Sequence, residues 1–188
     1  MLMWGQIPVP WTVSWTGEER QFVAIDPHVR RRALMMDVAP GIGKPQFGKP
    51  HSQRQRQCIA ECRCDTCGRP IQSTELKISL SHARFRDNAA VTANGTGILQ
   101  VEPLLDRACA RDAIRWCPSL KKDIAVGTLS VLQVMSHRVQ FAIMGVQFIQ
   151  HYVPDFVPTP ADAKGIVGHA KVELLRWKNR DQQWLEAA

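Results

Sequence analysis

The chain has 188 residues and carries 24 Lys and Arg against 17 Asp and Glu, a formal net charge of +7 at pH 7. Hydrophobic residues make up 45 % and charged residues 22 %, which excludes global disorder and collagen-like or coiled-coil-like composition. The length suits one domain over residues 1–188, and the absence of any run of about 18 apolar residues excludes a membrane span.

Alternating apolar and polar residues predict a β-hairpin formed by residues 11–14 and 21–25. Residues 29–36 follow as a short basic segment, which we interpret as helical. The next segment, residues 39–50 with the sequence APGIGKPQFGKP, is rich in Gly and Pro. We expect no regular structure there, but an extended basic arm.

Residues 51–61, HSQRQRQCIAE, contain good helix formers and no helix breaker, so they predict a short helix. Its hydrophobic face is thin, and we expect the helix to lie on the surface. Residues 73–82 and 97–101 predict two strands. Residues 105–117 have the spacing of an amphipathic helix, which Pro118 ends.

Residues 126–135 and 139–149 are rich in β-branched and apolar side chains and predict two buried strands. The Pro-rich residues 154–160 interrupt the chain. Residues 165–177 fit either a strand or an amphipathic helix, and residues 181–187 predict a terminal helical turn. The elements together predict an α+β fold with an antiparallel sheet.

Cysteine usage points to a metal site. The first residues lack a basic stretch followed by a long apolar segment, so we expect no secretory signal and a cytoplasmic location. In that reducing compartment, clustered cysteines are more often metal ligands than disulfides. The chain has six: Cys58, Cys62, Cys64, Cys67, Cys109 and Cys117.

Cys64 and Cys67 form a CxxC motif followed by Gly68, which is the strongest motif of the chain. Two thiolates three residues apart in a turn can face one ion, and the glycine lets the backbone turn beneath it. Cys109, near the start of a predicted helix, would add a third thiolate. A turn, two strands and ligands on a helix follow the order of a treble-clef zinc finger, so we predict a structural zinc unit at about residues 58–120.

The fourth ligand has several candidates. Asp106 precedes Cys109 by three residues and would share its helix face. Cys117 lies eight residues after Cys109, about 12 Å along a helix, whereas thiolates on one zinc lie about 3.8 Å apart. Thiolate is nevertheless the softer and commoner ligand, so Cys117, Cys62 or a histidine stay open. We favour Asp106, and interpret Cys58 and Cys62 as packed or surface cysteines.

The stretch CDTCGRP, followed by EPLLDRACARDAIRWCP, resembles an uncharacterised family of small phage and actinobacterial proteins. That family has a CxVCGxP turn and a P-x-x-H-x-x-C-A helix ending in Cys-Pro. The preceding GKPQFGKPHSQRQRQ is similar to its lead-in, so the resemblance covers about residues 40–120. The family's histidine falls on Asp106, which supports position 106 as a ligand position. The resemblance implies a phage or prophage context and no established activity.

The positive charge is local. Residues 27–69 contain nine cations and three acids, so the remaining chain is close to neutral. Such a stretch can neutralise phosphates, although a solvated face without a ligand is the alternative. We predict contacts to a nucleic-acid backbone, or to an acidic protein partner, through seven residues: Arg30, Arg31, Arg32, Lys44, Lys49, Arg54 and Arg56.

Enzymatic motifs are weak. The GIGK at residues 41–44 fails the phosphate-loop spacing because position 38 is Val and Pro45 follows the lysine, so we expect no nucleotide. His82 and Asn88 are fragments of an HNH-type nuclease motif on a zinc scaffold. We therefore predict a phage-type, zinc-stabilised binding protein that is not an enzyme. The alternatives are a protein-interaction module, as a virion component or an inhibitor of a host defence complex, and an HNH-like nuclease.

Overall fold

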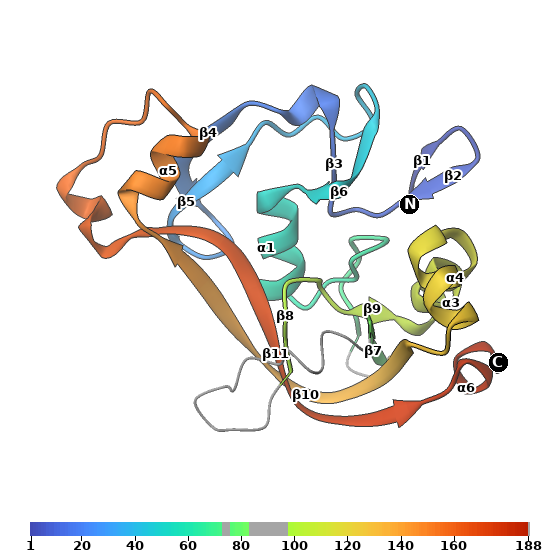
Figure 1. The fold of residues 1–188 in the computed structure, drawn as a ribbon. Helices are drawn as coiled ribbons and strands as arrows, with labels where there is room; N and C mark the ends of the chain where they lie inside the picture. The colour runs from blue at the N-terminus through green and yellow to red at the C-terminus, as the bar shows by residue number, and fades with distance from the viewer. Residues whose placement is uncertain (73–75, 83–97, 188) are drawn as a thin grey trace.

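The main body of the protein is a mixed β-sheet, seen in a computed structural model that describes residues 1–72, 76–82 and 98–187 (Figure 1). The strand order is β4-β5-β11-β10-β7-β9, and β8 also pairs with β11. Only the pairing of β5 with β11 is parallel among the described strands. An α+β class is therefore confirmed. The strands are β4 (Gln21–Asp26), β5 (Arg31–Met36), β7 (Lys77–His82), β8 (Ile98–Gln100), β9 (Leu105–Asp106), β10 (Leu129–Met144) and β11 (Ile166–Arg180).

Two small sheets and short helices surround this body. One sheet pairs β1 (Leu2–Trp4) with β2 (Ile7–Val9), and the other pairs β3 (Val13–Trp15) with β6 (Pro45–Pro50). No helix in the described part of the chain is long and apolar enough to cross a membrane. The helices and 3-10 turns are η1 (Thr16–Glu18), α1 (Ser52–Ala60), α3 (Arg107–Trp116), α4 (Pro118–Ala125), α5 (Val146–Tyr152), η2 (Pro160–Lys164) and α6 (Gln182–Glu186).

The N-terminal predictions need three corrections. The hairpin of residues 11–14 with 21–25 does not form, because β3 pairs with β6 and β4 pairs with β5. Residues 31–36 are a strand rather than a helix, and residues 45–50 are a strand rather than an irregular arm. Four consecutive residues of β5 are buried, so this strand lacks the polar and apolar alternation that reveals a half-exposed strand.

The longest pairing of the sheet joins β10 and β11. The two strands predicted at residues 126–135 and 139–149 are one strand of 16 residues, and the helix α5 follows it. The polar residues Ser136 and His137 separate the two apolar stretches but do not form a turn. β10 stays paired with β11 on both sides of them, and the irregularity is taken up by shifts in register. Residues 165–177, which fit two alternatives, belong to the strand β11.

Several predictions farther along the chain are confirmed. The helices α1, α3 and α6 and the strands β7 and β8 lie where the sequence indicates them, with boundaries shifted by a few residues. β7 pairs with β10 and β9, whereas β8 pairs with β11. Asn88 lies outside the described residues.

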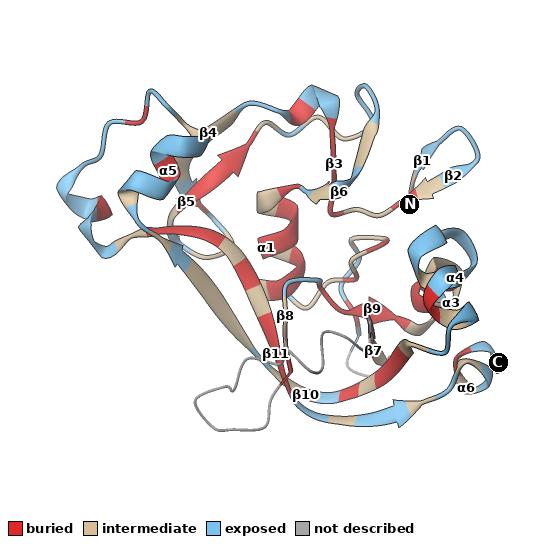
Figure 2. Cartoon of the chain, viewed as in Figure 1, coloured by how far each residue is buried: buried red, intermediate tan, exposed pale blue. Residues whose placement is uncertain are grey.

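The helix α1 lies inside the molecule, which corrects its predicted surface position (Figure 2). It packs against β11 and β5. The Gln55 side chain donates to the carbonyl of Ala170 (2.8 Å) and accepts from its N–H (3.0 Å), so its amide acts as a strand partner for β11. The Gln55 amide thus bonds to β11 between two residues that pair with other strands: Val167, which pairs with β5, and Val172, which pairs with β8.

Candidate metal centre

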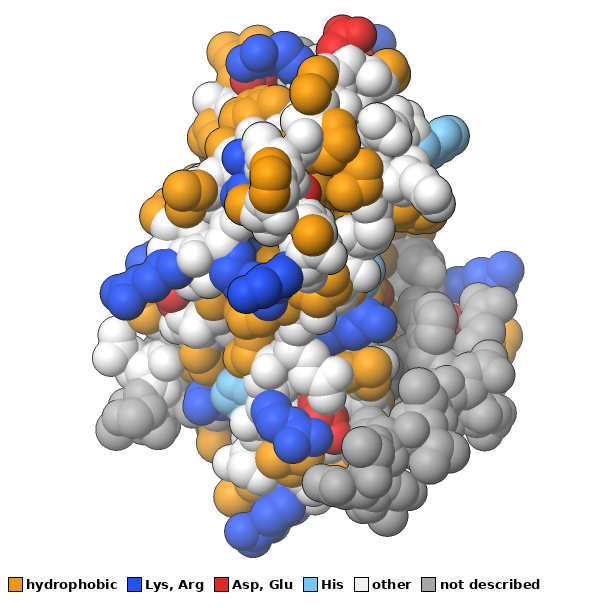
Figure 3. All heavy atoms as spheres, turned by 90° about the vertical axis from the view of Figure 1, so that its left-hand side faces the viewer, with side chains coloured by type: hydrophobic (Ala, Val, Ile, Leu, Met, Phe, Trp, Pro, Cys, Tyr) orange, Lys and Arg blue, Asp and Glu red, His pale blue; other side chains and the backbone are white. Residues whose placement is uncertain are grey.

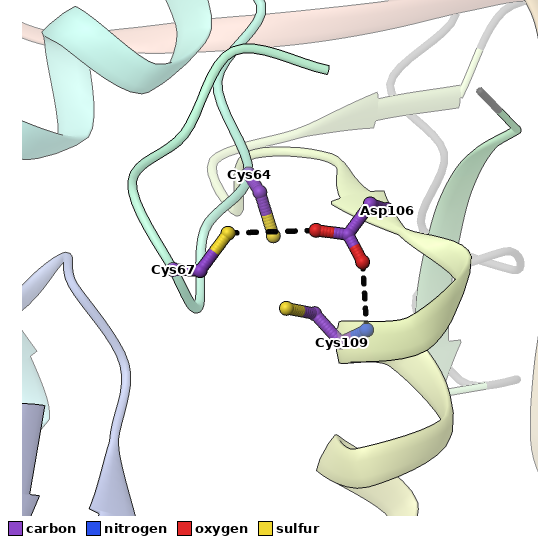
Figure 4. A group of neighbouring side chains, drawn as sticks. All are labelled: Cys64, Cys67, Asp106 and Cys109. Carbon is purple, nitrogen blue, oxygen red and sulfur yellow. Dashed lines mark hydrogen bonds between the residues drawn. The ribbon is translucent and has the colours of Figure 1, made fainter. Parts of the chain in front are cut away.

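Four side chains from two distant segments meet at one point. The Sγ atoms of Cys64, Cys67 and Cys109 and a carboxylate oxygen of Asp106 all lie within 4.8 Å of one another. Figure 4 shows these atoms directed toward a common position. Cys64, Cys109 and Asp106 are buried and Cys67 is half-buried. The four residues are close enough to hold a metal ion.

The first two ligand candidates sit in a turn closed by backbone hydrogen bonds. The Gly68 N–H donates to the carbonyl of Cys64 (2.9 Å), and the Cys64 N–H donates to the carbonyl of Arg69 (2.8 Å). The turn is also anchored to the rest of the molecule, because the Asp65 N–H donates to the carbonyl of Leu104 (3.0 Å). This bond ties the turn to the segment that leads into the second ligand pair.

Gly68 is required at this turn for two reasons. Its φ is +72°, a left-handed conformation that residues with a side chain rarely adopt. A Cβ at this position would also lie 2.7 Å from Cγ of Trp11. The glycine therefore allows both the turn and the close approach of the Trp11 ring.

Asp106 uses its two carboxylate oxygens differently. Oδ1 accepts from the N–H of Cys109 (2.8 Å) and caps the N-terminus of α3. Oδ2 lies 3.5 Å from Sγ of Cys67 and therefore faces the thiolates. Because the cap fixes the carboxylate relative to the first helical turn, Asp106 and Cys109 present their ligand atoms as a unit.

Hydrogen bonds and burial set the protonation of the cluster. A hydrogen bond with the Cys109 side chain, aided by the N–H groups of Cys67 and Asp106, lowers the pKa of Cys64. The same side-chain bond and burial raise the pKa of Cys109. Burial raises the pKa of Asp106, but hydrogen bonds from Cys109 and the other thiols outweigh it and lower the pKa overall. Because metal ligands bind as thiolates, loading an ion would release protons here.

The donor set fits a tetrahedral, thiophilic ion. Three sulfur atoms and one oxygen make four ligands, and ligands on zinc lie about 3.8 Å apart when Zn–S is near 2.3 Å. The four ligand atoms lie within 4.8 Å of one another, so no pair is more than about 1 Å farther apart than this spacing. Cys117 is the residue at which α3 ends and α4 begins, and neither it nor Cys62 belongs to the group.

Arg69 also belongs to this site, although the sequence distinguishes it only as one of nine cations in residues 27–69. Its Nε donates to Sγ of Cys67 at 3.5 Å. A guanidinium beside the half-buried thiolate offsets part of the negative charge that three thiolates and one carboxylate bring together. A cation directly after CxxCG is the sequence signal that could have indicated this role.

The cations predicted to contact a partner divide into two groups, and Arg54 belongs to the inner one. Its Nη1 and Nη2 donate to both carboxylate oxygens of Glu18 (2.5 and 2.8 Å), and Nε donates to the carbonyl of Trp11 (2.7 Å). Both side chains of this ion pair are buried. Arg54 therefore holds the fold together, and its prediction as a nucleic-acid contact is wrong.

Arg56 requires the same correction. Its side chain is fully buried, and Nε donates to Oδ2 of Asp26 at 2.6 Å. Arg32 is partly exposed, but its Nε binds the buried Asp162 at 2.5 Å. Burial lowers the pKa of the Arg56 guanidinium, whereas Asp26 opposes that shift and keeps the charge compensated.

The outer group consists of the four remaining cations, whose side chains a partner could reach. Arg30, Arg31 and Lys44 are exposed and Lys49 is half-buried, and none has an ion-pair partner within residues 1–72, 76–82 and 98–187. Figure 3 shows Lys and Arg side chains at several places on the face that lies to the left in Figure 1, with hydrophobic side chains between them.

Comparisons with protein-family models, curated proteins and solved structures found no match to this chain.

Proposed function

We propose that this chain is a binding protein stabilised by one structural zinc ion. The observation that carries the proposal is the group of Cys64, Cys67, Cys109 and Asp106 within 4.8 Å. Four protein ligands complete a tetrahedral shell, which is typical of structural rather than catalytic zinc sites. The donor set favours zinc because thiolates dominate it and the oxygen ligand is one that zinc also accepts.

The order of elements supports a treble-clef-like unit. A cysteine turn is followed by strands and then by a helix, α3, whose first turn carries the second ligand pair. When bound, zinc supplies a cross-link between the two segments. The chain's own residues then orient the ligands: Gly68 shapes the turn, Asp106 caps the helix and Arg69 donates to Cys67.

Elemental analysis of the purified chain tests the metal. We expect about one zinc per chain, and a Cys67→Ser variant that loses most of it. The matched control is Cys117→Ser, which removes a half-buried cysteine that lies outside the group. Zinc retained by Cys67→Ser but lost by Cys117→Ser would overturn the ligand assignment.

Nucleic-acid backbone contact is the binding function that the exposed cations favour. Arg30, Arg31, Lys44 and Lys49 have no acid partner in the described part of the chain, so their charge is available to phosphates. Four phosphate contacts would give a slope of about −3 to −4 for log K against log salt on duplex DNA. The suspected phage context agrees with such a role and stays a prediction.

A charge-matched pair of variants tests this contact. Replacing Arg30, Arg31, Lys44 and Lys49 by Ala should weaken binding to DNA of arbitrary sequence and flatten the salt slope. The control replaces four exposed cations elsewhere on the surface and removes the same charge: Lys121, Lys122, Arg176 and Lys178. Equal loss in both variants would indicate a general charge effect, and no DNA or RNA binding would favour an acidic protein partner.

The nuclease alternative has a direct test. His82 ends β7, but its side chain lies outside the described part of the structure. Incubating the protein with DNA and Mg²⁺ or Mn²⁺ should leave the DNA intact if the chain only binds. Cleavage that disappears in His82→Ala would replace the binding proposal with an enzymatic one.

A further inference from the structure

Arg107 lies between two of the ligand candidates, Asp106 and Cys109, in the first turn of α3. Its Nη2 donates to the backbone carbonyls of Trp184 and Ala187, the second at 2.6 Å. Its guanidinium carbon also lies 4.6 Å from the centre of the Trp184 ring. The segment that carries two ligands thus also carries a contact that holds the C-terminal helix α6.

The helix α6 depends on such contacts. It has five residues, too few to be stable alone in water. Leu185 is buried in the same hydrophobic cluster as Cys64 and Cys109, and Arg180 places a second guanidinium 4.7 Å from the Trp184 ring. The docking of α6 is therefore supported by the buried Leu185, by two guanidinium groups near the Trp184 ring, and by the hydrogen bonds from Arg107.

The position of Arg107 depends in turn on the metal centre. Asp106, the residue before Arg107, caps α3 with one carboxylate oxygen, and its other carboxylate oxygen faces Cys67. An ion held by Asp106 and Cys109 would fix the chain on both sides of Arg107. Without the ion, the first turn of α3 keeps its cap, the pairing of Asp106 with Lys77 of β7 and the burial of Cys109, but it loses the cross-link to Cys64 and Cys67. Terminal turns of helices fray most readily when such a restraint is lost.

We infer that metal loading of this centre docks the C-terminal helix α6 through Arg107. The inference rests on the proposed metal site and adds a conformational consequence to it. Because coupling between two equilibria is reciprocal, docking of α6 strengthens metal binding by the same factor as metal binding strengthens docking.

Hydrogen exchange of the full chain loaded with Zn²⁺ measures the docking. Arg107→Ala should leave the zinc content near that of the native chain while residues 181–187 exchange about tenfold faster. Peptides from β4 and β5, which are distant in sequence and belong to the far edge of the sheet, should be unchanged. The matched control is Arg115→Ala, on the same helix but exposed and 3.9 Å from Asp112, which should leave α6 protected.

A second variant tests the reverse direction and does not touch the ligand segment. Trp184→Ala removes the ring that Arg107 and Arg180 contact. Competition with a chromophoric chelator should show zinc affinity about five- to tenfold weaker than in the native chain. This result decides the question if Arg107→Ala does not fold.

The outcomes separate the two proposals. Native affinity for zinc in Trp184→Ala, with α6 exchanging rapidly, would overturn the coupling and leave the metal site intact. Slow exchange of α6 in zinc-loaded Arg107→Ala would overturn it as well. A native chain that binds no zinc at all would overturn the proposed function, and the inference with it.

Discussion

The metal centre and the helix α1 both join segments that are far apart in the chain, but by different chemistry. The metal centre gathers soft ligands that an ion can cross-link, and its two halves are short motifs, Cys64 with Cys67 and Asp106 with Cys109. The helix α1 gathers buried ion pairs and hydrogen bonds whose partners lie 30 to 115 residues away. Charge in the sequence can therefore belong to the interior of the fold as well as to its surface.

This difference predicts how each region fails. Removal of an ion from the metal centre releases a cross-link while the ligands can be protonated, so no charge need stay buried without a partner. Removal of one member of an ion pair at α1 leaves an uncompensated buried charge, which is among the costliest changes a fold can undergo. For each atom removed, substitutions in α1 should therefore lower the free energy of unfolding more than changes at the metal centre.

Arg54→Met should have the largest effect. It leaves the Glu18 carboxylate, which is fully buried, without its guanidinium partner. The free energy of unfolding should fall by roughly 3–5 kcal/mol, measured by urea denaturation of the zinc-loaded protein. Lys44→Met, at an exposed lysine, is the control and should change stability little. A loss below about 1 kcal/mol for Arg54→Met would show that water or another group compensates Glu18.

Gln55→Leu should have an intermediate effect, because it removes hydrogen bonds without leaving a charge. The Ala170 N–H and carbonyl would lose their partners in the sheet. Each unsatisfied buried group costs roughly 1–3 kcal/mol. Gln57→Leu, a half-buried glutamine on the same helix, is the matched control. Equal unfolding free energies for the two variants would contradict the role of Gln55 as a strand partner.

The sequence predicts the two regions unequally for a physical reason. Ligand spacing is set by the geometry of one turn or one helical face. The sequence alone could therefore indicate these four ligand candidates: Cys64, Cys67, Asp106 and Cys109. The partners of Arg54 and Arg56 are chosen by the tertiary fold, and no local pattern relates Arg54 to Glu18 or Arg56 to Asp26. A helix with few apolar residues consequently suggested a surface position, although its polar groups are satisfied inside.

The same reasoning explains the errors in strand pairing. Turn residues and alternation locate strands such as β7 and β8, but they do not name a partner across the sheet. β3 joins β6 more than 25 residues away, and β10 passes through a polar interruption that resembles a turn. The fold class could thus be predicted from local pattern, whereas topology required the long-range pairs.

His51, the N-cap residue of α1, should give the smallest effect, a change in how stability depends on pH. Its ring is fully buried, Nε2 lies 3.0 Å from the carbonyl of Asp37, and Nδ1 accepts from the N–H of Arg54. The surrounding charged groups are Glu18, with Oε1 at 3.9 Å, and the guanidinium groups of Arg54 and Arg56. Burial and the charge of Arg54 outweigh Glu18 and lower the pKa of His51 below its ordinary value.

The unfolded state therefore binds a proton at His51 more readily than the folded state. The stability that the neutral His51 side chain contributes is complete above the unfolded-state pKa of about 6.5, and it declines as the pH falls below that value. His51→Asn keeps a side chain that can cap α1 but cannot titrate in this range. Between pH 7.5 and 5.5, zinc-loaded native protein should lose more unfolding free energy than His51→Asn. A parallel loss in both proteins would assign the acid sensitivity to groups other than His51, namely the metal ligands or His137 and His169, whose pKa values burial also lowers.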